Sequence, residues 1–159
     1  MMTTPQVNTP AALGLTWPQA TVLEFLSGSD KQLDPIRIMK GLFVFSMEAP
    51  EAWLPKEERH HFVPYSYGPY SQQVNSDLGQ LGIKGYVQMT LVPGKSWSYY
   101  SLTSEGESVA ERIAPAFNPA AIDYLRRLRE FVVNLSFRQL LDTIYAKYPE
   151  YAVNSVFKF

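Results

Sequence analysis

The stretch Tyr67-Gly68-Pro69-Tyr70-Ser71 decides the expected fold, because a helix is predicted to begin directly after it. Ser71 is a residue type that commonly caps helix N-termini, and Gly82 is placed to end the helix. Gly68-Pro69 predicts a tight turn that sets the direction of this helix. An apolar stripe recurs at helical spacing and is expected to face the core: Tyr70, Val74, Leu78 and Leu81.

Two further helices are expected before this motif. Thr16 caps the first, which runs to about Leu26. Asp34-Pro35 begins the second, because a capping residue followed by proline is typical of a helix start. The body of this second helix is apolar around most of its circumference, so we expect it at the centre of the core. Residues 49–69 are expected to form a connector with one helical turn near residues 55–61.

A β-hairpin is expected after the third helix. Val87, Met89 and Leu91 alternate with more polar residues, which predicts a half-buried strand. Pro93-Gly94 supplies the two central residues of a type II turn. The return strand is expected over residues 97–102.

Three helices are expected towards the C-terminus. The spacing of Ser104 and Glu107 predicts a capping box that opens the fourth helix, which ends near Pro115. Asn118-Pro119 opens the fifth helix, and Ser136 caps the sixth. The residues expected to face inward are Ile122, Leu125, Leu128 and Val132 in the fifth helix and Phe137, Leu140, Leu141 and Ile144 in the sixth.

This order of elements predicts a fold that is mainly α with a small β-hairpin: a winged helix-turn-helix core plus a C-terminal helical extension from about residue 119. Residues 1–14 are rich in threonine, proline and asparagine and are expected to be a disordered tail. Residues 15–159 are expected to form a single winged-helix-like domain, because a chain of 159 residues suits one hydrophobic core.

The composition is that of an ordinary globular protein, with 46% hydrophobic and 18% charged residues. The chain has no cysteine, which excludes disulfides, thiolate zinc sites and a cysteine nucleophile. No apolar run approaches the ~20 residues of a membrane-spanning helix, and no secretory signal is recognisable, so we expect a cytoplasmic protein without a membrane partner. The net charge of −1 is spread evenly, whereas nucleic-acid-binding proteins usually carry a basic surface.

The third helix is the first candidate for a contact with DNA or with a protein. Glutamine side chains can pair with adenine edges in the major groove. Residues 71–82 contain no lysine or arginine, however, so phosphate contacts are expected to be weak and a structural or protein-binding role is favoured. The candidate contact residues are Gln72, Gln73, Ser76 and Gln80 on the exposed face, with Lys84 and Lys95 beside them.

Two other clusters are candidates for a binding surface. The first, Phe62, Tyr65, Tyr67 and Tyr70, is either a platform for a peptide or for bases or, as favoured here, a rigid cover over the edge of the core. The second is a basic patch made of Arg126, Arg127 and Arg129. Its spacing from Asp123 and Glu130 predicts i,i+4 ion pairs, so a solvated helix face is favoured over a contact for nucleic acid or an acidic partner.

No pattern of catalytic or metal-binding residues is recognisable. His60 and His61 are adjacent and point in different directions on a helix, so a surface turn is favoured over a metal or acid–base site. Pro93-Gly94-Lys95-Ser96 is like the end of a phosphate-binding loop, but Met89 stands where that loop needs a glycine. We therefore expect no catalytic residue, no cofactor, no metal ligand and no enzymatic activity.

Three motifs together resemble a known group of bacterial proteins. They are FVPYSYGPYS at residues 62–71, YSLTSEG at residues 100–106 and YAKYPEY at residues 145–151. These motifs resemble the YwgA-like proteins over roughly residues 33–159, and the Tyr-Gly-Pro element is distantly similar to the Panacea antitoxin domain of the SocA type. The resemblance implies a winged-helix-like domain without a cofactor, used for toxin neutralisation or as a protein adaptor.

The sequence thus predicts a non-enzymatic winged-helix-like protein-interaction module, an antitoxin or adaptor in a toxin–antitoxin or phage-defence context. The alternative is a winged-helix transcriptional regulator that binds DNA. The expected partner is a toxin or another neighbouring gene product. A homodimer through the C-terminal helices is a further expectation, because one small core is not expected to cover all of Phe131, Val132, Tyr145, Tyr148 and Phe157.

Overall fold

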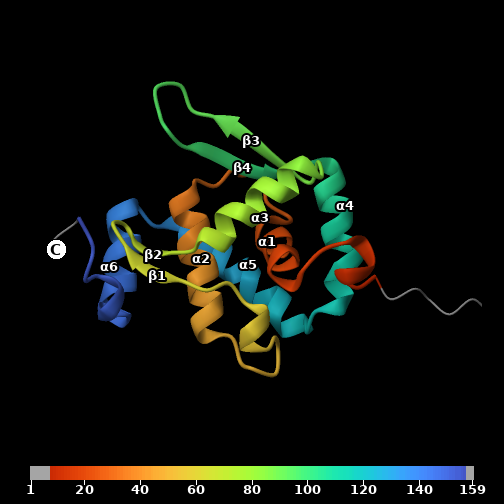
Figure 1. Ribbon diagram of the computed structural model, residues 1–159, viewed down its shortest axis with the longest axis horizontal. Helices are drawn as coiled ribbons and strands as arrows, with labels where there is room; N and C mark the ends of the chain where they lie inside the picture. Colours follow the sequence, from red (N-terminus) through yellow and green to blue (C-terminus); the bar gives the residue numbers. More distant parts are fainter. Residues whose placement is uncertain (1–7, 157–159) are drawn as a thin grey trace, which may run out of the picture.

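Three helices form the centre of the structure, a computed structural model that describes residues 8–156 (Figure 1). Helix α5 (Pro119–Asn134) packs against both α1 (Trp17–Leu26) and α2 (Pro35–Glu48). One continuous cluster of buried apolar side chains draws on all six α-helices. The prediction of a mainly α fold with a small β-hairpin is therefore confirmed.

The remaining helices surround this centre. Helices α3 (Gln72–Ile83) and α4 (Ser104–Ile113) both contact α1, and α6 (Phe137–Lys147) contacts α2. Short 3-10 turns follow α4 at Ala114–Ala116 and α6 at Pro149–Tyr151. Among the described residues, no helix has the length and apolar character needed to cross a membrane.

The contact between α1 and α2 is close because α2 has a glycine near its centre. A Cβ atom at Gly41 would lie 2.4 Å from Cζ of Phe25, a separation that real side chains do not tolerate. Glycine costs about 1 kcal/mol relative to alanine inside a helix. The full burial of the Phe25 ring against α2 compensates for that cost.

The predicted helix starts are confirmed for α1, α2, α5 and α6. Thr16 and Ser136 each form a capping box with the glutamine three residues later. Asp34 and Asn118 each accept a backbone N–H through the side chain, and each is followed by proline in the first turn. These signals are local, so the packing of the rest of the chain does not disturb them.

The predicted cap of the fourth helix is wrong by one residue. Thr103 rather than Ser104 is the N-cap, because its Oγ1 accepts the backbone N–H of Gly106 at 3.0 Å. Glu107 therefore does not close a capping box. Its carboxylate instead accepts hydrogen bonds from the Ser27 hydroxyl and the next backbone N–H, at the end of α1.

Helix α3 begins as predicted and ends later than predicted. Ser71 Oγ accepts the backbone N–H of Val74 at 3.2 Å. The helix continues beyond Gly82, and the chain leaves it through Gly85, whose φ is +83°. A left-handed φ is costly for residues with a Cβ atom, so Gly85 rather than Gly82 ends the helix.

The connector between α2 and α3 contains a hairpin that was not predicted. Strand β1 (Val63–Tyr65) pairs with β2 (Gly68–Tyr70) in antiparallel fashion. Its two-residue turn is Ser66-Tyr67, so the predicted tight turn at Gly68-Pro69 is misplaced, and those residues belong to the strand. The helical turn expected earlier in the connector is a 3-10 turn at Lys56–Glu58.

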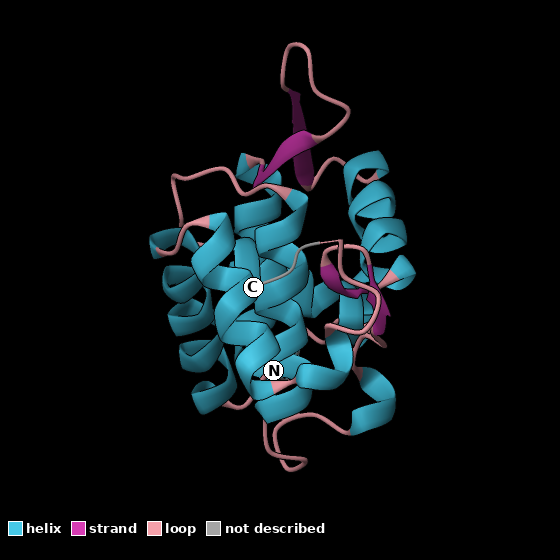
Figure 2. Cartoon of the chain, turned by 90° about the vertical axis from the view of Figure 1, so that its left-hand side faces the viewer, coloured by secondary structure: helices cyan, strands magenta, loops and turns pink. Residues whose placement is uncertain are grey.

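The second hairpin, β3 (Val87–Leu91) and β4 (Ser98–Leu102), rises from the helical body (Figure 2). The turn at Pro93-Gly94 is confirmed, with a φ of +76° at its glycine. The first residue of β3 is buried, but Met89 is 59% and Leu91 77% exposed, so the predicted half-buried strand is wrong over most of its length. The reason is that the helices cover only the base of this hairpin.

The helices and the β3–β4 hairpin follow the predicted order, with the β1–β2 hairpin inserted between α2 and α3. In addition, Leu33, between α1 and α2, pairs with Tyr100 of β4 through two backbone hydrogen bonds of 2.9 and 2.8 Å. The connector between α2 and α3 spans residues 49–71. It is much longer than the turn of about three to four residues that joins the two helices of a helix-turn-helix unit.

The chain termini differ from the expectation of a disordered tail and a dimer interface. Residues 8–14 of the expected tail include a 3-10 turn at Ala11–Leu13, and residues 1–7 lie outside the described residues.

Of the residues expected at the dimer interface, Phe157 lies outside the described residues. The other four are buried or half-buried within one chain: Phe131, Val132, Tyr145 and Tyr148. The expected surplus of apolar surface is therefore absent at these four positions.

Candidate functional site

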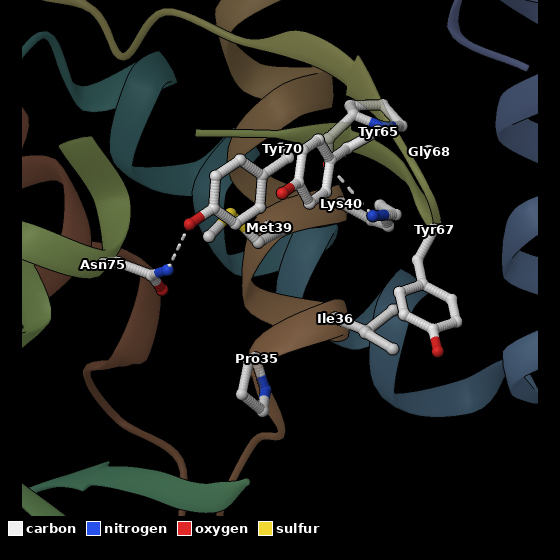
Figure 3. A pocket seen from close by; sticks show the side chains of 10 residues that line it. Pro35, Ile36, Met39, Lys40, Tyr65, Tyr67, Gly68, Tyr70 and Asn75 are labelled. Carbon is white, nitrogen blue, oxygen red and sulfur yellow. Dashed lines mark hydrogen bonds between the residues drawn. The ribbon is translucent and has the colours of Figure 1, made fainter. Parts of the chain in front are cut away.

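A hollow of about 190 Å³ opens beside the first half of α2, where α2, the β1–β2 hairpin and α3 meet (Figure 3). Most of its lining is apolar or aromatic. The lining residues are Pro35, Ile36, Met39 and Lys40 of α2, Tyr65, Tyr67, Gly68, Pro69 and Tyr70 of the hairpin, and Asn75 of α3. The Tyr-Gly-Pro-Tyr motif therefore forms one wall of this hollow.

Two tyrosines stack across the hairpin. Tyr65 lies opposite Gly68 in the register of the two strands, and Tyr70 is two residues further along. Diagonal neighbours on one face of a sheet come within reach of aromatic side chains. Because Gly68 has no side chain, the rings of Tyr65 and Tyr70 meet with their centroids 4.8 Å apart and their planes inclined by 25°.

The first turns of α3 hold the Tyr70 ring in place. Its hydroxyl donates to Oε1 of Gln72 and accepts from Nδ2 of Asn75, both at 2.8 Å. The ring is thus fixed by stacking on one side and by hydrogen bonds at its tip. An aromatic side chain held in this way loses little conformational entropy when a ligand binds.

A buried lysine forms part of the hollow's wall. Lys40 is only 2% exposed, and its Nζ donates to the carbonyl oxygen of Pro69 at 3.0 Å. Burial lowers the pKa of Lys40 from 10.5 to about 7, against the opposing effect of Asp34. Near neutral pH, the charge in this otherwise apolar wall is therefore sensitive to small changes in its surroundings.

A second, larger hollow lies next to the first one at the first turn of α2. This second hollow, of about 590 Å³, shares Pro35, Ile36 and Tyr67 with the first. It reaches the β3–β4 hairpin and α6, where it adds three rings: Trp97, Tyr99 and Phe137. The rings of Trp97 and Tyr99 meet edge to face at 5.0 Å. We call the two hollows together the aromatic groove.

The structure bears out the exposed face that was predicted for α3. Gln72, Gln73, Ser76 and Gln80 are exposed, as are Lys84 and Lys95. Two of the glutamines also have internal partners, because Gln72 binds Tyr70 and Gln80 accepts from Nε2 of Gln19 at 2.8 Å. A large apolar residue, Ile83, follows on the same helix and is 89% exposed.

The predicted basic patch is reduced to two arginines. Arg126 and Arg127 are exposed, and Arg127 pairs with Asp123 at 2.9 Å, as the i,i+4 spacing predicts. Arg129 is buried, and its guanidinium donates to the carbonyl of Ser27 at the end of α1. It is therefore a structural tie between α5 and α1, which corrects its assignment to a solvated face.

The predicted surface turn at the two histidines is also corrected. His61 is exposed, but His60 is buried, with Nε2 2.8 Å from Oδ2 of Asp77 on α3. The neighbouring Arg59 is buried as well and donates to the carbonyls of Ser46, Pro50 and Leu54. These side chains hold the connector against the helices, and the His60–Asp77 pair is buried. Among the described residues, no group of three His, Cys, Asp or Glu is suitable for a metal ion.

Neither a comparison with protein-family models nor one with curated protein sequences found a match for this chain. The resemblance to the YwgA-like proteins therefore rests on the sequence motifs alone.

The sequence did not reveal Lys40, Trp97 or Tyr99 as residues of the site. The one signal for Lys40 in the sequence is its position inside the otherwise apolar run of residues 38–45. Trp97 and Tyr99 lie far from the Tyr-Gly-Pro motif in the sequence, and only the packing of the β3–β4 hairpin brings them to the groove.

Proposed function

We propose that this chain is a non-enzymatic protein-interaction module of the antitoxin or adaptor type, and that the aromatic groove binds an extended segment of its partner. The observation that carries the proposal is the set of aromatic side chains that lines two neighbouring hollows beside α2, with Tyr67 shared between them. Aromatic-lined grooves are a recurring way to bind extended, proline-containing segments. The expected ligand is therefore an extended segment with proline or aromatic side chains.

The rigidity of the groove supports this proposal. Tyrosine and tryptophan are enriched among the residues that dominate protein interfaces, because they bury a large area with few rotatable bonds. In this groove the Tyr65 and Tyr70 rings are stacked and Tyr70 is hydrogen-bonded. Much of the ordering cost is thus met before a partner arrives.

A selection of short random peptides displayed on phage tests the proposal directly. We expect the folded chain to select extended peptides rich in proline and aromatic residues. Replacing Tyr65 and Tyr67 by serine should lower the affinity for the selected peptides by about tenfold or more. The reason is that truncating central interface residues typically costs ~1–2 kcal/mol of binding free energy each. Isothermal titration calorimetry measures this change.

A matched control uses another exposed apolar surface. Ile83 and Leu91 are both more than three-quarters exposed and lie outside the groove. Replacing them by serine should leave peptide affinity unchanged. If binding is lost in this control and kept in the tyrosine variant, the partner binds on the α3 side and the groove assignment is wrong. The same two variants, co-expressed with the products of neighbouring genes, test whether the natural partner uses this surface.

A second candidate function is that of a winged-helix DNA-binding regulator. The observation in its favour is the backbone pairing of Leu33 with Tyr100, which joins the segment between α1 and α2 to the hairpin that follows α3. Against it, α3 carries no lysine or arginine, and the net charge is −1. A gel-shift titration with promoter DNA at low and high salt tests this function. Binding that weakens steeply with salt supports it, and no binding at low salt removes it.

A further inference from the structure

A separate polar hollow of about 530 Å³ lies between α1, α4 and α5 and shares no lining residue with the aromatic groove. Its lining includes Glu24 of α1, Glu107 and Glu111 of α4, Arg126 of α5 and three serines. The hollow therefore has three carboxyl groups and one guanidinium in its lining.

Glu24 is the unusual member of this group. It is 3% exposed, and its Oε2 atom accepts no hydrogen bond from any described residue. Burial raises the pKa of Glu24 to about 8, with Arg126 acting in the opposite direction and Glu107 adding to the rise. A buried carboxyl oxygen without a donor is costly and lacks the partner that such groups normally have.

The other two acids belong to successive turns of α4. Glu107 already accepts hydrogen bonds from the Ser27 hydroxyl at 2.9 Å and from the backbone N–H of Gly28 at 3.0 Å. Glu111 is exposed at the edge of the hollow. The hollow thus combines a buried carboxyl group with an accessible one, and each of them, when ionised, acts only as a hydrogen-bond acceptor.

We propose that this hollow binds an organic cation, a primary ammonium or guanidinium group, with Glu24 as its buried acceptor and Glu111 as its acceptor at the edge. The cation takes the place of the carboxyl proton of Glu24, which passes to solvent. A charge-assisted hydrogen bond then satisfies the carboxylate. The source of the cation is either a free amine or a lysine or arginine side chain of a partner.

This binding mode predicts a specific pH dependence. The charged groups around Glu24 are Glu107 and Glu111 on α4 and Arg126 on α5, with the buried Arg129 close to Ser27. Because binding requires ionised Glu24, affinity should rise as pH increases towards about 8, by up to about tenfold per pH unit. Below that pH, about one proton should be released for each cation bound.

Calorimetry on the full chain tests the proposal with two probes, spermidine and a short blocked peptide that contains one arginine. Proton release is read from the difference in heat between two buffers with different ionisation enthalpies. Binding of spermidine identifies a site for free amines, and binding of the peptide alone identifies a site for a partner's side chain. Either result supports the proposal. Binding of Ca²⁺ or Mg²⁺ without binding of either amine would overturn it.

The variants make the test specific to Glu24. Glu24→Gln should weaken binding by about tenfold or more and abolish proton release, because a neutral amide replaces the ionised acceptor. Glu111→Gln alters only an exposed side chain and should weaken binding while the proton release remains. Glu130→Gln, on α5 and outside the hollow, is the control and should bind like the unaltered chain. Unchanged affinity in Glu24→Gln would overturn the proposal without affecting the groove.

Discussion

Two buried ionisable side chains, Lys40 and Glu24, are the most informative single residues of this protein. Both lie on central helices, and neither forms an ion pair with another described residue. Burial shifts the pKa of each towards neutrality, downwards for Lys40 and upwards for Glu24. The stability of the folded chain is therefore linked to pH at two independent positions.

Lys40 should make the protein more stable as pH rises. Its pKa is about 7 in the folded chain and 10.5 ordinarily, so between these values the unfolded chain binds more protons. The free energy of unfolding therefore rises across this window, and the stabilisation is lost as pH falls through about 7. In Lys40→Met this rise should disappear. Urea unfolding at a series of pH values measures it, and an unchanged slope in the variant would contradict the assignment.

Glu24 should have the opposite effect. Its pKa is about 8 in the folded chain and 4.5 ordinarily, so the folded chain binds more protons between these values. The free energy of unfolding falls as pH rises through this window, by up to ~1.4 kcal/mol per pH unit. Glu24→Gln should remove this fall and should be more stable than the unaltered chain near pH 8. Thermal unfolding near pH 5 and near pH 8 tests the prediction, with Glu130→Gln as the control.

At the scale of elements, the close contact of α1 with α2 depends on Gly41. Gly41→Ala places a Cβ against the Phe25 ring and should destabilise the fold by roughly 1–3 kcal/mol, the usual cost of overpacking. Gly79→Ala on α3 is the matched control, because no atom lies within 4 Å of its added Cβ. That variant should stabilise the chain by about 0.5–1 kcal/mol. Chemical unfolding measures both, and two changes of the same sign would count against this account.

The connector between α2 and α3 is held by side chains rather than by secondary structure. The buried guanidinium of Arg59 donates to the carbonyls of Leu54, Ser46 and Pro50. Arg59→Lys keeps the charge but loses the planar fork, so we expect a loss of ~2–4 kcal/mol in the free energy of unfolding. Arg127→Lys, in an exposed ion pair, should change it by less than ~0.5 kcal/mol. Equal effects of the two substitutions on the urea midpoint would refute this role for Arg59.

At the scale of the whole molecule, a single apolar cluster joins the six helices and predicts that they unfold together. Leu125 of α5 is fully buried at the centre of this cluster. Leu125→Ala should lower the free energy of unfolding by ~2–5 kcal/mol. Far-ultraviolet circular dichroism and tryptophan fluorescence should shift together, because Trp17, Trp53 and Trp97 report on different regions. Separate transitions for the two probes would show that the cluster is not one cooperative unit.

Part of the candidate site was predictable from sequence, and part was not. The exposure of Gln72, Gln73 and Gln80 follows from helical periodicity, which needs no knowledge of other elements. For the aromatic residues around the Tyr-Gly-Pro motif, the sequence allows a binding platform but favours a cover over the edge of the core. The sequence did not indicate that Lys40 and Trp97 belong to the groove, because their place in it depends on contacts between segments distant in sequence.

The sequence by itself determined the number and order of the helices, the cap residues of α1, α2, α3, α5 and α6 and the turn at Pro93-Gly94. These features depend on hydrogen bonds and backbone angles within a few residues, so they are present in the local sequence. Only the tertiary structure decided that His60, Arg59 and Arg129 are buried and that Glu107 binds the end of α1. Buried polar groups need partners, and here those partners lie on other elements, so their places were set when the helices packed.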